Sequence, residues 1–129
     1  MHNLNITISN TSESPIYQQI YDQISAQIIN GELPGDFCLP PIRTVAKELR
    51  ISIITVKRAW EELEHSGFIY TMTGKGCFVK PHPVEKLNTR RTTLASDKLA
   101  KDIEYYRSLG LSLSDLIELI KECWNNGKT

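Results

Sequence analysis

The chain lacks several features that would place it in other classes of protein. Its 129 residues include only three cysteines, Cys38, Cys77 and Cys123, which are far apart and odd in number. No pair has metal-ligand spacing, so we expect reduced thiols in a cytoplasmic protein, with no metal or other cofactor. No apolar run approaches the roughly 20 residues of a membrane-spanning helix. The N-terminus has neither the basic start nor the apolar block of a secretory signal, and we expect no membrane partner.

Catalytic patterns are missing as well. The sequence has no nucleophile paired with a base and no carboxylate pair with supporting context. The segment TGKG at residues 73–76 does not have the pattern of a phosphate-binding P-loop. We therefore expect that the protein is not an enzyme.

Positive charge is absent from the first third of the chain. Residues 1–42 contain four acids and no lysine or arginine, for a charge of −4. Residues 43–91 carry ten bases and five acids, for +5, and residues 92–129 carry −1. The zero net charge thus conceals a basic middle third, which leaves a nucleic-acid partner open.

The first half of the chain predicts an arm followed by three helices. Residues 1–13 are polar and alternate weakly at Leu4, Ile6 and Ile8, as in a short extended arm or edge strand. Ser14 as N-cap and Pro15 at the first helical position then begin an amphipathic helix that ends near Asn30, with Gly31 as terminator. A short helix starts near Pro41, and a third, capped by Ser52, covers Ile53 to about His65.

The connector between the second and third helices has only two or three residues, which is typical of a helix-turn-helix. After Gly67 the period changes to two, and the segment TGKG separates two short apolar stretches. Two glycines around a lysine permit positive φ, so a β-hairpin is expected here. Residues 81–91 contain two prolines and three bases and are interpreted as a linker.

Two further helices are expected within residues 96–110 and 112–126, the second opened by a capping box of Ser112 and Asp115. The second has an apolar stripe that a monomer would leave exposed. We therefore expect a two-fold homodimer through this stripe, which consists of Leu113, Leu116, Ile117, Ile120 and Trp124.

The amino-terminal end of the segment 53–65 is the candidate DNA-binding surface. Lys57 and Arg58 would neutralise phosphates, and Thr55 would bond a base edge or a phosphate. Ile53 and Ile54 have two interpretations: they complete the packing between helices, or they contact thymine methyl groups in the major groove.

Residues 14–79 resemble the winged helix-turn-helix domain of the GntR family of bacterial transcription regulators, through PIYQQI, LPPIRTVAKEL, TVKRAWEELE, GFI and GKGCFV. The tail segment LGLSLSDLIELIKECW looks like the YtrA-like subgroup, in which a short helical tail mediates dimerisation. The resemblance implies a mainly α fold: a winged helix-turn-helix of three helices and a β-hairpin wing, followed by a two-helix dimerisation tail. It also implies DNA contacts by Arg43, Ser52, Thr55, Lys57, Gly74 and Lys75.

These observations predict a DNA-binding domain at 13–81 and a linker with a dimerisation tail at 82–129. The expected function is a homodimeric, sequence-specific transcription regulator, a repressor, that binds a palindromic operator through helix 53–65 and the wing at 73–76. The alternative is a winged-helix module that binds an acidic protein and no DNA. The tail is too short for a roomy cavity, so a small-molecule effector would need the dimer interface or the domain junction.

Overall fold

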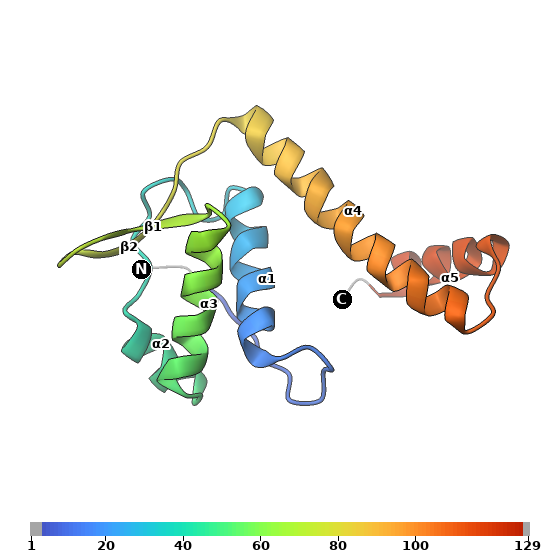
Figure 1. Cartoon of the computed structure of the whole chain (residues 1–129), viewed down its shortest axis with the longest axis horizontal. Coiled ribbons are helices and arrows are strands. Elements are labelled where there is room, and N and C mark those ends of the chain that lie inside the picture. The colour runs from blue at the N-terminus through green and yellow to red at the C-terminus, as the bar shows by residue number, and fades with distance from the viewer. Residues whose placement is uncertain (1–3, 128–129) are drawn as a thin grey trace. The chain divides into compact units, whose positions relative to one another are not determined.

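Three helices, a β-hairpin and two further helices follow one another in the computed structural model, which describes residues 4–127 (Figure 1). They are α1 (Ile16–Ile29), α2 (Ile42–Leu49), α3 (Ile53–His65), β1 (Ile69–Met72), β2 (Gly76–Val79), α4 (Val84–Ser108) and α5 (Leu113–Asn126). This order confirms the predicted mainly helical fold with a hairpin wing and two C-terminal helices. The contacts within the chain divide it into two units, one up to Asn88 and the other from Thr89.

The core of the first unit lies where α1 packs on α3, with α2 packed on α3 as well (Figure 1). The stripe of isoleucines every four residues on α1 explains the packing, because such spacing puts the side chains on one face of a helix. The edge of the Tyr21 ring meets the Phe68 ring at a centroid distance of 6.1 Å. The largest fully buried side chains are Phe68, Ile20, Ile24, Leu33, Leu63, Ile69, Val56 and Val79.

The start of α1 differs by one residue from the prediction. Pro15, not Ser14, is the N-cap, and no side chain caps this end. Ser14 instead donates its N–H to Ser12 Oγ at 3.0 Å, because Pro15 is extended (ψ 153°) and Ser14 lies outside the helix. The predicted end is confirmed, with Asn30 as C-cap and Gly31 at φ 83°.

The hairpin is held by a third segment of the chain. β1 and β2 pair antiparallel from Ile69↔Val79 to Met72↔Gly76. On the other side of β2, the Asp36 N–H donates to Val79 O at 2.7 Å and the Leu39 N–H to Cys77 O at 2.9 Å. Both edges of β2 are therefore hydrogen-bonded, one to β1 and the other to residues 36–39, and these bonds hold the hairpin in place.

The linker is much shorter than predicted, because α4 begins at Val84 and not near Ser96. The N–H groups of Lys86 and Leu87 donate to Pro83 O at 3.0 and 3.1 Å, so Pro83 starts the helix. From Val84 to Leu109 the chain has no glycine or proline. The prediction of a linker over residues 84–91 was wrong, because this first part of α4 has no continuous apolar stripe and the helix buries no residue.

The last helix begins as predicted. Ser112 Oγ accepts the Asp115 N–H at 3.1 Å, while an Asp115 carboxylate oxygen accepts the Ser112 N–H at 3.0 Å. This reciprocal pair is a capping box. Gly110, at φ 86°, reverses the chain between α4 and α5.

Candidate nucleic-acid interface

The turn between α2 and α3 is made by three residues. Arg50 adopts the left-handed conformation at φ 59° and ends α2. Its N–H donates to Lys47 O at 3.3 Å, and the Ile51 N–H donates to Ala46 O at 3.0 Å, which closes the end of the helix. Ser52 then caps α3, so the chain turns sharply from one helix into the next, as in a helix-turn-helix.

Two hydroxyl groups sit together at the start of α3. Ser52 Oγ accepts the Thr55 N–H at 3.1 Å, which satisfies one of the backbone donors that every helix leaves open at its start. The same oxygen is 2.7 Å from Thr55 Oγ1. Ser52 is exposed and Thr55 half-buried, so the pair offers donors and acceptors at the surface.

The two isoleucines of this turn differ in exposure. Ile54 is 78% exposed and Ile53 is 41% exposed. Val56, Ala59, Trp60 and Leu63 on the same helix are buried and form its inward face. Ile54 therefore does not complete the packing between the helices in this structure, and its side chain is presented to solvent.

The predicted cations occupy different settings. Arg43, in the first turn of α2, and Lys57 on α3 are both exposed. Arg58 instead lies over the ring of Tyr17 on α1, with its guanidinium carbon 3.8 Å from the ring centroid. Its Nη2 also donates to the Tyr17 hydroxyl at 3.2 Å. The sequence did not point to this contact, which fixes the orientation of Arg58 and ties α3 to α1.

The wing presents its lysine at the tip of the hairpin. The Lys75 N–H donates to Met72 O at 2.8 Å, closing the turn, and Lys75 and Gly74 are exposed. Gly74 at φ 78° and Gly76 at φ 122° supply the positive φ values that the turn requires.

The base of the wing is fixed by an aromatic pair. The Tyr70 ring stacks on Phe78 with centroids 5.5 Å apart, and the Tyr70 hydroxyl donates to Asp36 Oδ1 at 2.8 Å. This hydrogen bond to the Asp36 carboxylate raises the pKa of Tyr70 above its ordinary value.

The predicted dimerisation residues lie on α5, in the second unit. Leu116 is only 8% exposed and is covered by the chain itself. The other four residues of the stripe are open to solvent: Leu113 (74% exposed), Ile117 (41%), Ile120 (54%) and Trp124 (78%).

A contact missed by the sequence predictions joins the N-terminal arm to α1. Gln19, Gln23 and Gln27 hydrogen-bond to the backbone of residues 5–9. The signal was present as a four-residue repeat of glutamine beside the isoleucine stripe. It was hidden because glutamine is usual on the solvent side of a helix.

Within residues 4–127, no group of histidine, cysteine, aspartate or glutamate side chains is arranged to hold a metal ion. The three cysteines are free. No helix in the described part of the chain is long and apolar enough to cross a membrane.

A short connector between two helices, a capped third helix with an exposed first turn and a lysine-tipped hairpin define a winged helix-turn-helix protein. Residues 16–79 match the model of the bacterial regulatory proteins of the gntR family. The chain is 32% identical over 117 residues to the HTH-type transcriptional regulator YhcF of Bacillus subtilis, covering 90% of this chain and 95% of YhcF. The protein therefore belongs to the GntR family of DNA-binding transcriptional regulators, and the expectation that it is not an enzyme is confirmed by this membership.

Two further Bacillus subtilis relatives differ in how much of them the chain covers. The transcriptional repressor YtrA is 33% identical over 118 residues, which are 91% of this chain and 90% of YtrA. The transcriptional repressor NagR is 37% identical over 92 residues, which are 71% of this chain but only 38% of NagR. The predicted resemblance to the YtrA-like subgroup is thus confirmed over most of the chain.

Solved structures give the same picture. A protein from Listeria monocytogenes described as a transcriptional antiterminator superposes with a TM-score of 0.67 at 32% identity, covering 94% of this chain and 90% of that one. The DNA-binding domain of AraR, solved in complex with operator ORX1, superposes with a TM-score of 0.52 at 26% identity, covering 61% of this chain and 99% of that one.

Proposed function

We propose that the protein is a homodimeric transcriptional repressor that acts in the bacterial cytoplasm and binds a palindromic operator. The observation that carries this proposal is the exposed first turn of α3. It presents the Ser52–Thr55 hydroxyl pair and the exposed Ile54 side chain, and the exposed Lys57 follows at the start of the next turn. The first turn of a recognition helix is the part that enters the major groove.

Each predicted residue then has a distinct role. Thr55 and Ser52 bond a base edge or a phosphate, and Ile54 contacts a thymine methyl group. Arg43, Lys57 and Arg58 neutralise phosphates, and the wing tip at Gly74 and Lys75 reaches the neighbouring backbone or groove. Phosphate contacts hold the register, whereas Thr55 and Ile54 supply sequence preference.

The domain division of 13–81 for DNA binding and 82–129 for linker and dimerisation is part of the same proposal. Four large apolar side chains on α5 are open in the single chain. Burying each one favours association by about 1.5–3 kcal/mol, against an entropic cost of about 4–15 kcal/mol. Leu116 supports this face from within the tail. A two-fold dimer presents two α3 helices to two half-sites about one DNA turn apart, or a multiple of that spacing.

An operator selected from random DNA sequences by the full-length protein tests the function. The expected product is an inverted repeat. The logarithm of its binding constant should fall linearly with the logarithm of the salt concentration, with a slope of about −0.9 per neutralised phosphate. Arg43→Ala and Thr55→Ala weaken operator binding, while the control Lys101→Ala, an exposed cation in the tail, does not. Retention of an acidic protein without any DNA selection contradicts the proposal.

A small-molecule effector is part of the proposal, and its site would lie at the dimer interface. A tail of two helices has no room for a ligand cavity of typical size. Thermal shift of the DNA-free and operator-bound protein against a metabolite panel tests this, since an effector must bind the two states differently.

A further inference from the structure

The N-terminal arm is held to α1 by a regular series of side-chain amides. Gln23 Oε1 accepts the Thr7 N–H at 2.9 Å, and Gln23 Nε2 donates to Thr7 O at 2.7 Å. Gln19 makes the same pair with Ser9, at 2.9 and 3.0 Å, and Gln27 Nε2 donates to Asn5 O at 2.7 Å. We call Gln19, Gln23 and Gln27 the glutamine ladder.

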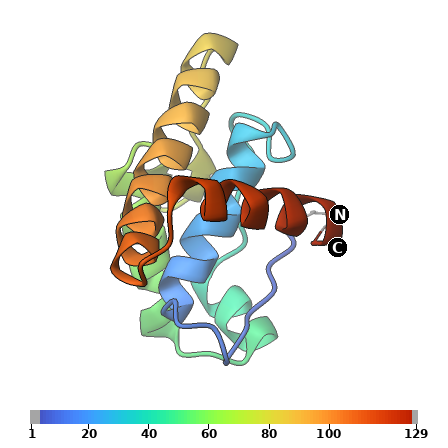
Figure 2. The ribbon, with the colours of Figure 1, turned by 90° about the vertical axis from the view of Figure 1, so that its right-hand side faces the viewer.

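The spacing of the glutamine ladder matches that of an extended chain. Four residues of helix advance about 6.0 Å, and two residues of extended chain advance about 6.6 Å. Successive glutamines of the ladder therefore meet every second residue of the arm. A primary amide carries a donor and an acceptor, as a peptide group does. The arm thus runs antiparallel to α1 and is bound through its backbone, in a manner similar to strand pairing (Figure 2).

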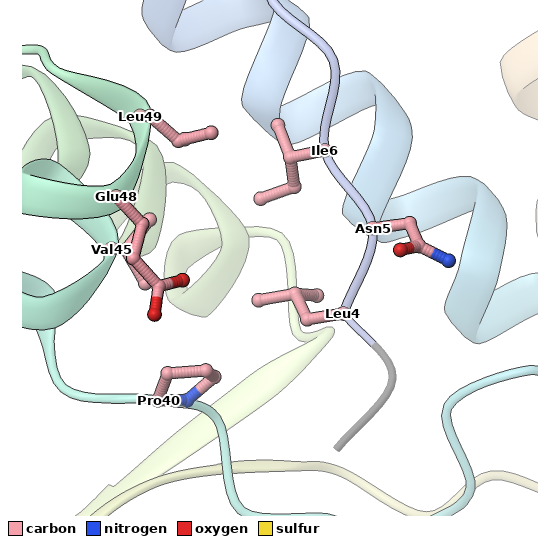
Figure 3. A pocket seen from close by; sticks show the side chains of 7 residues that line it. All are labelled: Leu4, Asn5, Ile6, Pro40, Val45, Glu48 and Leu49. Carbon is pink, nitrogen blue, oxygen red and sulfur yellow. The ribbon is translucent and has the colours of Figure 1, made fainter. Parts of the chain in front are cut away.

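Because α1 binds the backbone of the arm, the side chains of alternate arm residues point toward α2. Leu4 and Ile6 point toward α2, whereas Asn5 points away from it (Figure 3). Leu4, Ile6, Val45 and Leu49 line a cleft of about 260 Å³ between the arm and α2. Leu4 and Ile6 are half-buried, and Asn5 and Thr7 are exposed.

The arm is therefore bound to α1 and faces α2 across this cleft, and the main packing of both helices is with a third. α1 packs on α3, and α2 packs on α3. The arm is fixed to the polar edge of α1 and places Leu4 and Ile6 opposite Val45 and Leu49 of α2. α2 is short, with eight residues, and only Val45 and Ala46 are buried. A short helix with so small a buried face gains most from an additional support.

We propose that residues 4–9 and the glutamine ladder act as positioning residues for DNA binding, holding α2 and its Arg43 in the orientation that fits the operator. The inference rests on the proposed role of Arg43. The arm contacts no phosphate in this role; it acts through α2. Loss of the arm contact leaves the recognition helix intact and reduces the fraction of molecules with α2 correctly placed, which lowers apparent affinity in proportion.

The test compares the full-length protein with three variants. Gln23→Met keeps length and helix propensity and removes both bonds to Thr7. Gln18→Met is the matched control, because Gln18 bonds Asp22 on its own helix at 2.8 Å and not the arm. Tyr21→Phe removes the 2.9 Å bond to Ser66 Oγ and controls for a general loss of stability.

Two measurements are made on each variant: operator affinity at fixed salt, and hydrogen exchange of the Val45 and Ile51 amides, which donate within and beside α2. We expect Gln23→Met to lower operator affinity about three- to tenfold and to speed exchange of both amides, as for the loss of two hydrogen bonds. Gln18→Met and Tyr21→Phe should leave both quantities near those of the parent.

The inference is overturned if Gln23→Met binds the operator as the parent does, or if its α2 amides exchange no faster than in Tyr21→Phe. Failure of the proposed function gives a different result, because the parent and Gln18→Met would then also fail to select DNA. The exchange measurement needs no DNA, so it tests the support of α2 in either case.

Discussion

Ile54 is the residue whose surroundings carry the most information about binding. At 78% exposure on the first turn of α3, its side chain contributes little to the core. The neighbouring Ser52 and Thr55 already fix the helix start without it. In the proposed function Ile54 contacts an apolar group of the operator, and the thymine methyl group is the apolar feature of the major groove.

Ile54→Ala separates packing from recognition. We expect unfolding by urea to change by no more than about 0.5 kcal/mol, as is usual for surface positions. Operator affinity should fall about three- to tenfold, with a weaker preference for thymine at one position of each half-site. Ile53→Ala, at the less exposed neighbour, is the control for the loss of packing. A clear loss of stability with unchanged sequence preference would favour the packing interpretation.

Arg58 and Tyr17 form a second residue-scale test. The guanidinium carbon of Arg58 lies 3.8 Å from the Tyr17 ring centroid, within the range of a cation–π contact, and Arg58 Nη2 also donates to the Tyr17 hydroxyl. We expect a double-mutant cycle of Tyr17→Leu and Arg58→Met to give a coupling of about 0.5–1 kcal/mol in urea unfolding. Arg58→Met with Gln18→Met serves as the control cycle. Additive effects in the first cycle would show that the contact contributes nothing.

At the scale of elements, α5 is stabilised at its start by charge as well as by hydrogen bonds. The Ser112 N–H donates to the Asp115 carboxylate and lowers its pKa below the ordinary value. A carboxylate whose pKa is lowered by folding stabilises the folded state above its unfolded pKa, about 3.9 for aspartate, and loses that effect as pH falls through the lower folded value.

We therefore expect the first turn of α5 to be stable at neutral pH and to fray as pH drops below about 4. NMR chemical shifts of residues 113–116, followed from pH 7 downward, measure this directly. Asp115→Asn should remove the pH dependence, whereas Glu118→Gln on the same helix should keep it. An α5 start that is unchanged across this range would contradict the role of the capping box.

The elements also show what a single sequence can predict. The bounds of α3, the end of α1 and the hairpin followed from local chemistry: a serine cap, a glycine terminator and a change of period. The start of α4 did not, because residues 84–91 have no continuous apolar stripe and the helix buries no residue. The Tyr17–Arg58 contact, 41 residues apart in sequence, depends on how α1 packs on α3, which no local pattern encodes.

At the scale of the whole molecule, charge and apolar surface are separated along the chain. The bases concentrate in residues 43–91, which include α2, α3 and the wing. The exposed apolar side chains of α5 lie in the other unit. In the proposed function one unit binds DNA and the other binds a second copy, so we expect that a surface substitution in one unit alters one function and leaves the other intact.

Ile120→Asp uses this separation. Ile120 is 54% exposed, so an aspartate there is tolerated in the monomer, but in an apolar interface it is left without a partner. We expect sedimentation equilibrium to show a dimer for the parent and a monomer for the variant. Leu116 is not a suitable site, because it is already buried within the chain and its replacement would disturb the tail itself.

The same variant connects dimerisation to operator binding. Two linked recognition helices gain about 10²–10⁴ in affinity over one, provided that both half-sites are engaged together. Ile120→Asp should therefore lose at least about a hundredfold on the full inverted repeat and bind an isolated half-site as the parent does. Asn125→Asp, which places the same carboxylate outside the apolar stripe, should remain dimeric and bind normally. A monomeric variant with full affinity for the inverted repeat would rule out dimerisation through α5 as a requirement for operator binding.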